Sequence, residues 1–400
     1  MNLYRVLFVA GCPNSVRISK SIAKELTEIS ADKVKCEMIN TYRLEHDKAY
    51  RKPGILKGFV GDNRIITAKK ILEEKSPDII IVGDDGGINA FIVKLALLRS
   101  IPVIAVQVGM LSEEVRKSIK SIFRWRRYFL WRLFSRIIRN RLISKILVLI
   151  RWKVRVLEWG LGGTDLVAVM GDYYKELMIK RSVPPHKVVV YGYVLLDEIV
   201  RSASSEMLSH KLDNIPRLDQ TKKKILLLSQ TLVEDNICSL NKYINILEAL
   251  IGNLNSEYQL IIKPHPREDT GKYTRFINKY PDRVIITSPK HELAGLVFNA
   301  EIVSTFQSTS GLTALVYKKP LVIIDIAKFP YVNLLKSLGA TIDTIEGLRD
   351  FAQDPPDFIK SLSVDYKENI RKHLYRLDGN ASLRVARAIL KIISKSPPRH

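Results

Sequence analysis

The chain has 400 residues, of which 46% are hydrophobic and 26% are charged, and its formal net charge is +23. This composition excludes a disordered chain and is typical of two folded domains of ordinary size. The positive charge predicts an anionic partner, such as lipid headgroups, nucleic acid or a phosphorylated substrate. The three cysteines are too few and too scattered for a disulfide framework or a tetrahedral metal site, which favours a reducing, cytoplasmic location.

The first third of the chain predicts an α/β domain. Tyr4–Ala10 is an apolar strand that runs into the turn Gly11–Ser15 and then into a helical pattern. Strands at Asp78–Val82 and Ile101–Val106 follow, with helical patterns between them. The N-terminal apolar run is too short for a signal peptide. Because no run reaches about 18 apolar residues, we expect no membrane-spanning helix.

Acidic and small residues follow the strand that ends at Val82. Asp84 and Asp85 lie between Gly83 and a Gly-Gly pair. They have two interpretations: one of them caps the next helix, or both project toward a ligand. The flanking glycines favour close ligand approach. We expect the acceptor side of a site to include these loops and their neighbours, with the residues Gly11, Asn14, Gly86, Gly87, Gln107 and Gly109.

The segment from Val115 to Leu157 is strongly basic and aromatic. It holds 14 Lys or Arg, no Asp or Glu, and three of the four tryptophans. Apolar residues recur at helical spacing, which is typical of interfacial helices on anionic lipid. The alternatives are a helical hairpin packed on its own domain and binding to single-stranded nucleic acid, which the Ile- and Leu-rich face does not favour. The predicted membrane-binding residues are Trp125, Arg126, Arg127, Trp131, Arg132, Arg136 and Trp152.

Four segments divide the chain. We predict an acceptor-side Rossmann-like domain over 1–197, with the basic helical segment 115–157 inserted in it. A polar linker follows over 198–222. A second Rossmann-like domain that binds a nucleotide donor spans 223–378, and an amphipathic helix is predicted over 379–400. The expected fold class is therefore α/β, with two doubly wound domains facing one another across a cleft.

Polar clusters end the strands of the second predicted domain. One follows Gln259–Ile262 and reads Lys-Pro-His-Pro; another follows Ile302–Ser304 and is rich in Ser and Thr. Ligands of parallel sheets bind beyond the carboxyl ends of the strands, and hydroxyl and backbone N–H groups suit phosphate oxygens. We therefore expect a nucleotide-donor site built from Lys263, His265, Ser229, Gln230, Ser304, Ser308, Thr309, Ser310, Gly311 and Thr313.

The chain resembles the GT-B glycosyltransferase superfamily over most of its length. Residues 77–109 and 164–197 are similar to the first half of these proteins, and 299–324 and 378–392 are similar to the donor-binding half and the last helix. This resemblance implies that the helix over 379–400 crosses back to the first domain. Within the superfamily, Asp84-Asp85-Gly86, His265-Pro266 and Ser308-Thr309 resemble three motifs of sialyl- and polysialyltransferases and related capsule enzymes. CDP-glycerol-type polymer transferases are similar too.

The resemblance implies an inverting transfer of a sugar, or a polyol phosphate, to a lipid-linked or surface glycan acceptor. Asp84 or Asp85 would be the general base and His265 would contact the donor phosphate, with no cofactor and no metal required. Thr313 stands where many relatives have the Glu that holds ribose, which argues against an ordinary UDP-hexose donor. The expected partners are the nucleotide sugar, the acceptor and the inner face of the cell membrane. The alternatives are a non-hydrolysing UDP-GlcNAc 2-epimerase and a non-catalytic scaffold on membrane or nucleic acid.

Overall fold

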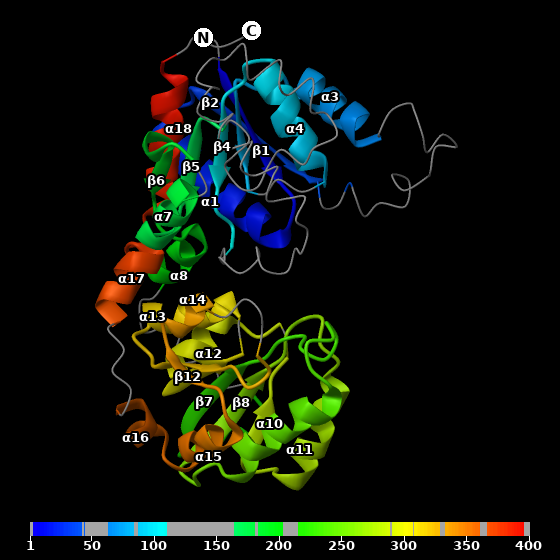
Figure 1. Cartoon of the computed structure of the whole chain (residues 1–400), viewed down its shortest axis with the longest axis vertical. Helices are drawn as coiled ribbons and strands as arrows, with labels where there is room; N and C mark the ends of the chain where they lie inside the picture. Colours follow the sequence, from blue (N-terminus) through cyan, green and yellow to red (C-terminus); the bar gives the residue numbers. More distant parts are fainter. Residues whose placement is uncertain are drawn as a thin grey trace. The chain divides into compact units, whose positions relative to one another are not determined.

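The fold consists of two compact units, each of which is an α/β domain (Figure 1). The structure is a computed structural model that describes residues 3–41, 44, 63–83, 87–109, 164–180, 183–202, 215–288, 290–306, 308–328, 333–360 and 366–395. Described residues up to 197, together with those from 371 onward, form the first unit, and those from 198 to 370 form the second. Asp84, Asp85, Gly86 and the predicted membrane-binding residues from Trp125 to Trp152 lie outside the described residues.

The described part of the first unit contains a parallel six-stranded sheet with the strand order β2-β1-β3-β4-β5-β6. Every paired neighbour in it is parallel. Its elements are β1 (Tyr4–Ala10), α1 (Pro13–Ile29), β2 (Val34–Asn40), α3 (Asn63–Lys75), β3 (Ile79–Val82), α4 (Gly87–Leu98), β4 (Val103–Val106), β5 (Leu166–Val169), α7 (Asp172–Lys180), η2 (Pro185–Lys187), β6 (Val188–Val190), η3 (Val194–Leu196) and α18 (Ala381–Ile393).

Alternate residues of these strands face opposite layers of helices. Val6 and Phe8 of β1 pack in the core formed with α1 and α18, whereas Leu7 and Val9 pack in the core formed with α3 and α4. This alternation is the period-two geometry of a strand, and both faces are apolar because both are covered. The sheet is therefore a buried middle layer, and only its strand ends can present polar groups.

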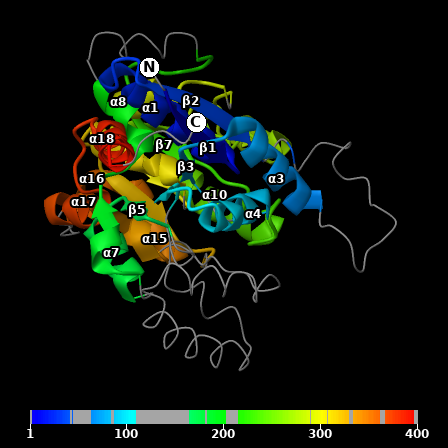
Figure 2. The ribbon, with the colours of Figure 1, turned by 90° about the horizontal axis from the view of Figure 1, so that it is seen from above.

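The C-terminal helix α18 belongs to the first unit. It packs beside α1, as both views show (Figures 1 and 2). The buried carboxylate of Asp197 accepts hydrogen bonds from the backbone N–H groups of Ala381 (3.1 Å) and Ser382 (2.6 Å), at the start of the helix. A negative charge at a helix N-terminus is favourable. The chain is thus tied back to its first unit over 184 positions of sequence.

The second unit has its own sheet, with the order β12-β11-β10-β7-β8-β9 among the described residues. All its paired strands are parallel. One face is covered by α10, α11 and α15, whose apolar residues form a single core with the strands. The elements are α8 (Asp197–Arg201), β7 (Lys223–Leu228), α10 (Leu240–Gly252), β8 (Tyr258–Lys263), η5 (Thr270–Tyr273), α11 (Thr274–Lys279), β9 (Val284–Ile286), α12 (Leu293–Asn299), β10 (Ile302–Thr305), η6 (Thr309–Leu312), α13 (Thr313–Val316), β11 (Leu321–Ile324), α14 (Asn333–Lys336), β12 (Ala340–Ile342), α15 (Ile345–Gln353) and α16 (Pro355–Lys360). The last helix before α18 is α17 (Tyr366–Leu374), whose residues up to 370 belong to the second unit and whose residues from 371 belong to the first.

These sheets confirm the predicted fold class of two parallel α/β domains. The predicted helical insertion over 115–157 lies outside the described residues. In the part of the chain that the structure describes, every helix is too short or too polar to cross a bilayer.

His373 gives the first unit a dependence on pH. Its ring is buried, 5.1 Å from the ring of Tyr173, and burial, aided by Lys372, lowers its pKa from 6.5 to about 4. The folded state binds the His373 proton more weakly than the unfolded state does. The contribution of His373 to the free energy of unfolding is therefore fully present above pH 6.5 and is lost as the pH falls toward 4. We expect a loss of about 3 kcal/mol in the free energy of unfolding over this window.

Urea unfolding between pH 7.5 and 4 measures this loss. In His373→Gln, which stays neutral, the part of the loss that comes from His373 should disappear. The control His186→Gln replaces an exposed histidine and should retain the wild-type profile. An identical slope in wild type and His373→Gln would contradict the assignment.

Candidate functional site

The strand order of the second sheet has one point where the chain reverses its direction of winding. From β7 the chain proceeds to β8 and β9 on one side, and it then returns to place β10, β11 and β12 on the other. The switch point lies between β7 and β10. In open α/β sheets, ligands bind beyond the carboxyl ends of the strands at such a point.

Strand register aligns the three loops that carry the predicted donor-binding residues. Leu228 at the end of β7 pairs with Lys263 on β8, and it also pairs with Thr305 on β10. The segments that begin at Ser229, Pro264 and Phe306 therefore leave the same edge of the sheet. Adjacent strands lie about 4.8 Å apart, so the ends of β8 and β10 are separated by about 10 Å, with the end of β7 between them.

The hydroxyl groups after β10 have two different environments. Ser304 and Thr305 are fully buried, and their hydroxyls donate to the carbonyl oxygens of Leu226 (3.2 Å) and Leu228 (3.1 Å) on β7. Ser308 and Thr309 are half-buried, and Ser310 is exposed. The Ser304 hydroxyl would have to leave its carbonyl partner to reach a ligand, whereas the later hydroxyls lie near the surface of the unit.

A compact turn holds these later residues close to the sheet. The hydroxyl of Thr305 accepts from the Ser308 N–H (3.0 Å), and that of Ser308 accepts from the Ser310 N–H (3.2 Å). A Cβ at Gly311 would lie 3.0 Å from Cγ2 of Thr305, which is tighter than ordinary contact. Glycine therefore lets the turn pack directly on the strand end. Thr313, at the start of α13, is buried below it.

His265 lies in the loop after β8, and its ring is half-buried. Its Nδ1 accepts a hydrogen bond from the Arg267 N–H at 3.2 Å, so the proton of the neutral ring is on Nε2. Burial, followed by the nearby Arg267 guanidinium, lowers the pKa of His265. Burial also lowers the pKa of Lys263, which ends β8. The loop therefore supplies a neutral Nε2–H donor beside a lysine.

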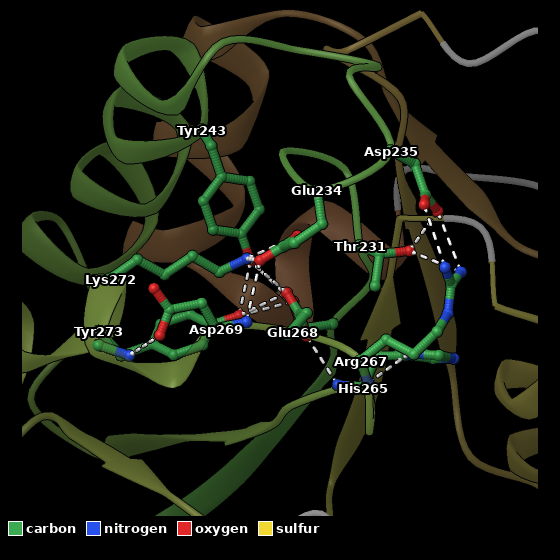
Figure 3. Close-up of polar contacts among 12 residues, drawn as sticks. Thr231, Glu234, Asp235, Tyr243, His265, Arg267, Glu268, Asp269, Lys272 and Tyr273 are labelled. Atoms are coloured by element: carbon green, nitrogen blue, oxygen red, sulfur yellow. Dashed lines mark hydrogen bonds and ion pairs between the residues drawn. The ribbon is translucent and has the colours of Figure 1, made fainter.

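An ion pair joins this loop to the loop after β7. The Arg267 guanidinium contacts both carboxylate oxygens of Asp235, at 3.2 and 3.1 Å, and it also donates to the Thr231 hydroxyl. The Thr231 hydroxyl, and then Arg267, lower the pKa of Asp235. Figure 3 shows this bridge beside His265. The two loops are thus connected by side chains as well as by the sheet.

A buried polar cluster lies beneath the His265 loop. Its hydroxyls come from Ser229, Tyr243 and Tyr273, which lie within 2.8 Å of one another. Burial raises the pKa of both tyrosines, so both are protonated donors near neutral pH. The cluster surrounds the carboxylate of Glu268, which also pairs with Lys272 at 2.8 Å (Figure 3).

In the first unit the switch point lies between β1 and β3, because β2 and β3 are on opposite sides of β1. Gly11 and Asn14 follow β1, and Gly83 follows β3. A Cβ at Gly83 would lie 2.6 Å from Cγ2 of Val108 and 2.7 Å from Cβ of Ser15. The loops after β1, β3 and β4 therefore converge at this glycine, which directly precedes Asp84 in the sequence.

Gln107 was predicted on the acceptor side, and its side chain forms hydrogen bonds within the first unit. It is buried, its Nε2 donates to the Gly109 carbonyl (2.8 Å), and its Oε1 accepts from the Met170 N–H (3.0 Å). It connects the loops after β4 and β5. A Cβ at Gly109 would meet open space, which leaves the backbone there accessible. Gly87 begins α4.

Apart from Ser229, the residues that support the His265 loop were not predicted from the sequence. Glu268 follows His265 by three positions. An acidic residue so close in sequence indicates a carboxylate that can accept a hydrogen bond from the backbone N–H of His265. Tyr243, Lys272 and Tyr273 had no comparable signal, since tyrosine and lysine are common in helices and loops. Among the described residues, no group of three or more His, Cys, Asp and Glu is arranged to hold a metal ion.

Residues 140–294 match the family model described as alpha-2,8-polysialyltransferase (POLYST). The matched part includes β7, β8 and the His265 loop, and it ends before the Ser308 turn. No curated protein sequence matches the chain significantly.

Solved structures with the same fold include two kinds of enzyme. The S. aureus MnaA–UDP structure is 15% identical, with a TM-score of 0.60 and 100% of both chains covered. The Neisseria meningitidis UDP-GlcNAc 2-epimerase with bound UDP-GlcNAc is 14% identical, with a TM-score of 0.59, 97% of this chain covered and 100% of that one. The wall teichoic acid polymerase TagF is 14% identical, with a TM-score of 0.56, 98% of this chain covered and 89% of that one.

At these identities the structural likeness concerns the fold, which is GT-B-like. Residues 140–294 are similar to the alpha-2,8-polysialyltransferase family model.

Gln230 offers a test of the donor-side residues. Its Oε1 is shielded from solvent and has no hydrogen-bond partner among the residues that the structure describes. The amide of Gln259, in contrast, accepts from the Asp219 N–H and donates to the Arg217 carbonyl, both at 3.0 Å. Gln230→Met removes an unpaired acceptor, so the free energy of unfolding should rise by about 1 kcal/mol. Gln259→Met should lower it by about 1–3 kcal/mol, because two backbone groups lose their partner.

Urea unfolding of both variants measures these changes. If Gln230 contacts the donor, the thermal shift produced by a bound nucleotide should shrink in Gln230→Met although the free protein is more stable. A loss of stability in Gln230→Met, with an unchanged nucleotide shift, would contradict a donor-binding role.

Proposed function

We propose that the chain transfers a sugar from a nucleotide-activated donor to a hydroxyl group of a glycan or lipid-linked acceptor. CMP-activated sialic acid is the first candidate donor, because residues 140–294 match the alpha-2,8-polysialyltransferase model. The observation that carries the proposal is the alignment of the His265 loop, the Ser229 loop and the Ser308 turn at the switch point of the second sheet.

In this proposal the second unit binds the phosphate of the donor. Ser308 and Thr309 offer hydroxyl groups on one side of the β7 end, and His265 offers its Nε2–H on the other. Lys263 adds a positive charge at the end of β8. Hydrogen-bond donors fixed in advance around a leaving phosphate stabilise the charge that develops on it, and in many enzymes such electrostatic stabilisation contributes most of the rate enhancement.

The reaction we propose is a single displacement. The acceptor oxygen forms a bond to the anomeric carbon of the sugar while the bond from that carbon to the phosphate oxygen breaks. The electron pair of the broken bond leaves with the nucleotide. Asp84 or Asp85 takes the proton of the acceptor hydroxyl, a task suited to a carboxylate. Ser304 and Thr313 are buried, so in this scheme they do not contact the phosphate.

We also propose that the protein associates peripherally with the inner face of the cell membrane through the basic segment 115–157. The support is its composition, with 14 Lys or Arg and three Trp and no acidic residue. Each basic residue near an anionic surface contributes on the order of 1 kcal/mol. Such attachment would keep the enzyme close to a lipid-linked acceptor.

The transfer reaction is tested with labelled sugar on CMP, CDP and UDP donors and a membrane acceptor fraction. We expect label to reach the acceptor from one donor class. Asp84→Asn or Asp85→Asn should lower kcat on the order of 100-fold, since one of them takes the proton. His265→Asn and Ser308→Ala should each lower kcat/KM about tenfold or more, since each removes a donor to the leaving phosphate.

His186→Gln, on the exposed η2 turn, is the matched control for His265→Asn and should transfer at the wild-type rate. Absence of transfer from every donor would refute the proposal. Conversion of UDP-GlcNAc to its 2-epimer by the same preparation would replace it with an epimerase.

Membrane association is tested by flotation with vesicles. The wild type should float with vesicles that contain anionic lipid and remain behind with neutral ones, and added salt should release it because exposed charges are screened. Replacing Arg126, Arg127 and Arg132 together by Gln should weaken flotation. A wild type that does not bind anionic vesicles even at low salt would refute this part of the proposal.

A further inference from the structure

We infer that Glu268 is a positioning residue, whose buried carboxylate fixes the loop that presents His265. The inference rests on the proposed function, because it assigns His265 a contact with the donor. It arises from the polar cluster around Glu268 (Figure 3), of which the sequence singled out Ser229 alone.

Four hydrogen-bond donors converge on this one carboxylate. Oε1 accepts from the Lys272 ammonium (2.8 Å), the Ser229 hydroxyl (2.9 Å) and the Tyr273 hydroxyl (3.0 Å). Oε2 accepts from the backbone N–H of His265 at 2.6 Å. The Glu268 side chain is 0% exposed. Its two oxygens therefore have separate tasks: one is held by the body of the unit, and the other holds the loop.

The partners on Oε1 come from rigid parts of the second unit. Ser229 follows the central strand β7, and Lys272 and Tyr273 belong to η5. The Tyr243 hydroxyl of α10 lies within hydrogen-bond distance of the Ser229 hydroxyl (2.7 Å) and the Tyr273 hydroxyl (2.8 Å) and can donate its proton to either. The Lys272 ammonium lies 4.6 Å from the centre of the Tyr243 ring. Lys272 also pairs with Glu234 at 2.9 Å. The position of the carboxylate is thus set from two sides.

The hydrogen bond from the His265 N–H to Oε2 fixes the backbone of His265 relative to the Glu268 carboxylate. A bond from a backbone N–H to an ionised carboxylate is short and about twice as strong as a neutral one. The Glu268 N–H donates in return to the His265 carbonyl at 2.9 Å, so the turn from 265 to 268 is closed by two hydrogen bonds. Within it, the Arg267 N–H reaches His265 Nδ1 and selects the Nε2–H tautomer.

A carboxylate is needed at this place because every neighbour of it is a donor. A glutamine amide accepts on one oxygen only, and its NH₂ group would face either the His265 N–H or the three donors on the other side. The buried charge is a poor source of stability, since an apolar core of similar volume is often as stable. The buried carboxylate of Glu268 instead holds the His265 loop in one position.

Glu268→Gln tests the inference on two independent readouts. In protein labelled with ¹⁵N-histidine, the seven histidines give a small set of amide signals, and His265→Asn identifies the one from His265. We expect this signal to move upfield in Glu268→Gln, because the N–H loses its ionised acceptor. We also expect kcat for transfer to fall about tenfold, while the KM for the acceptor stays within about twofold, since the leaving phosphate loses a well-placed donor.

Tyr273→Phe is the matched structural control. It removes one hydroxyl from Oε1 and leaves the contact between Oε2 and the His265 N–H in place. It should lower stability but keep the His265 amide signal and kcat. If Glu268→Gln does not fold, Glu268→Asp applies the same test, since its carboxylate is one methylene shorter and cannot reach both sets of donors.

Two results would overturn the inference: an unchanged His265 amide signal in the Glu268 variant, or a shifted signal with unchanged kcat. An equal loss of kcat in Tyr273→Phe would also overturn it, because the effect would then be general destabilisation. A wild-type protein without transfer activity refutes the proposed function instead, and the amide signal still reports whether Glu268 holds the loop.

Discussion

All paired strands of the second unit run in the same direction, and the rest of its site depends on this constraint. Parallel strands send their carboxyl ends to one edge, and the apolar residues of α10, α11 and α15 pack on a face of the sheet. The polar groups that follow the strands therefore gather at that edge. The winding order then decides which loops are neighbours: β7 lies between β8 and β10, so Ser229 lies between the His265 loop and the Ser308 turn.

The two sides of this arrangement are held by different forces. Backbone N–H groups and hydroxyls hold the turn after β10 in a compact form, and Gly311 lets it lie against the strand. The loop after β8 depends on charge: Glu268, Lys272 and Glu234 form a largely desolvated chain, and Arg267 and Asp235 form a second, more exposed pair. Low dielectric strengthens the buried contacts and also makes each of them costly to leave unpaired. A loop held in this way has one geometry.

The first unit repeats the same principle with fewer charges. Its switch point brings the loops after β1, β3 and β4 together at Gly83, where any side chain would collide with Ser15 and Val108. Gln107 uses both ends of its amide to connect the loops after β4 and β5. The return of α18 onto α1 gives this unit part of its core from the end of the chain.

The sequence by itself determined the two α/β domains, because apolar runs ending in glycine and polar clusters are local patterns that survive without any tertiary contact. It also placed the end of β3 at Val82, and it placed the ends of β8 and β10 one residue before Lys263 and Thr305, since each polar cluster follows its strand. Only the tertiary structure decided which of these polar groups lie near the surface and which are buried in hydrogen bonds to the protein itself. Ser304 is fixed to a carbonyl of the neighbouring strand, whereas Ser308, four residues later, lies near the surface. Likewise, Tyr243, Lys272 and Ser229 meet around Glu268 from separate elements. Contacts between residues so far apart depend on strand order and register, and no local pattern in the sequence encodes those.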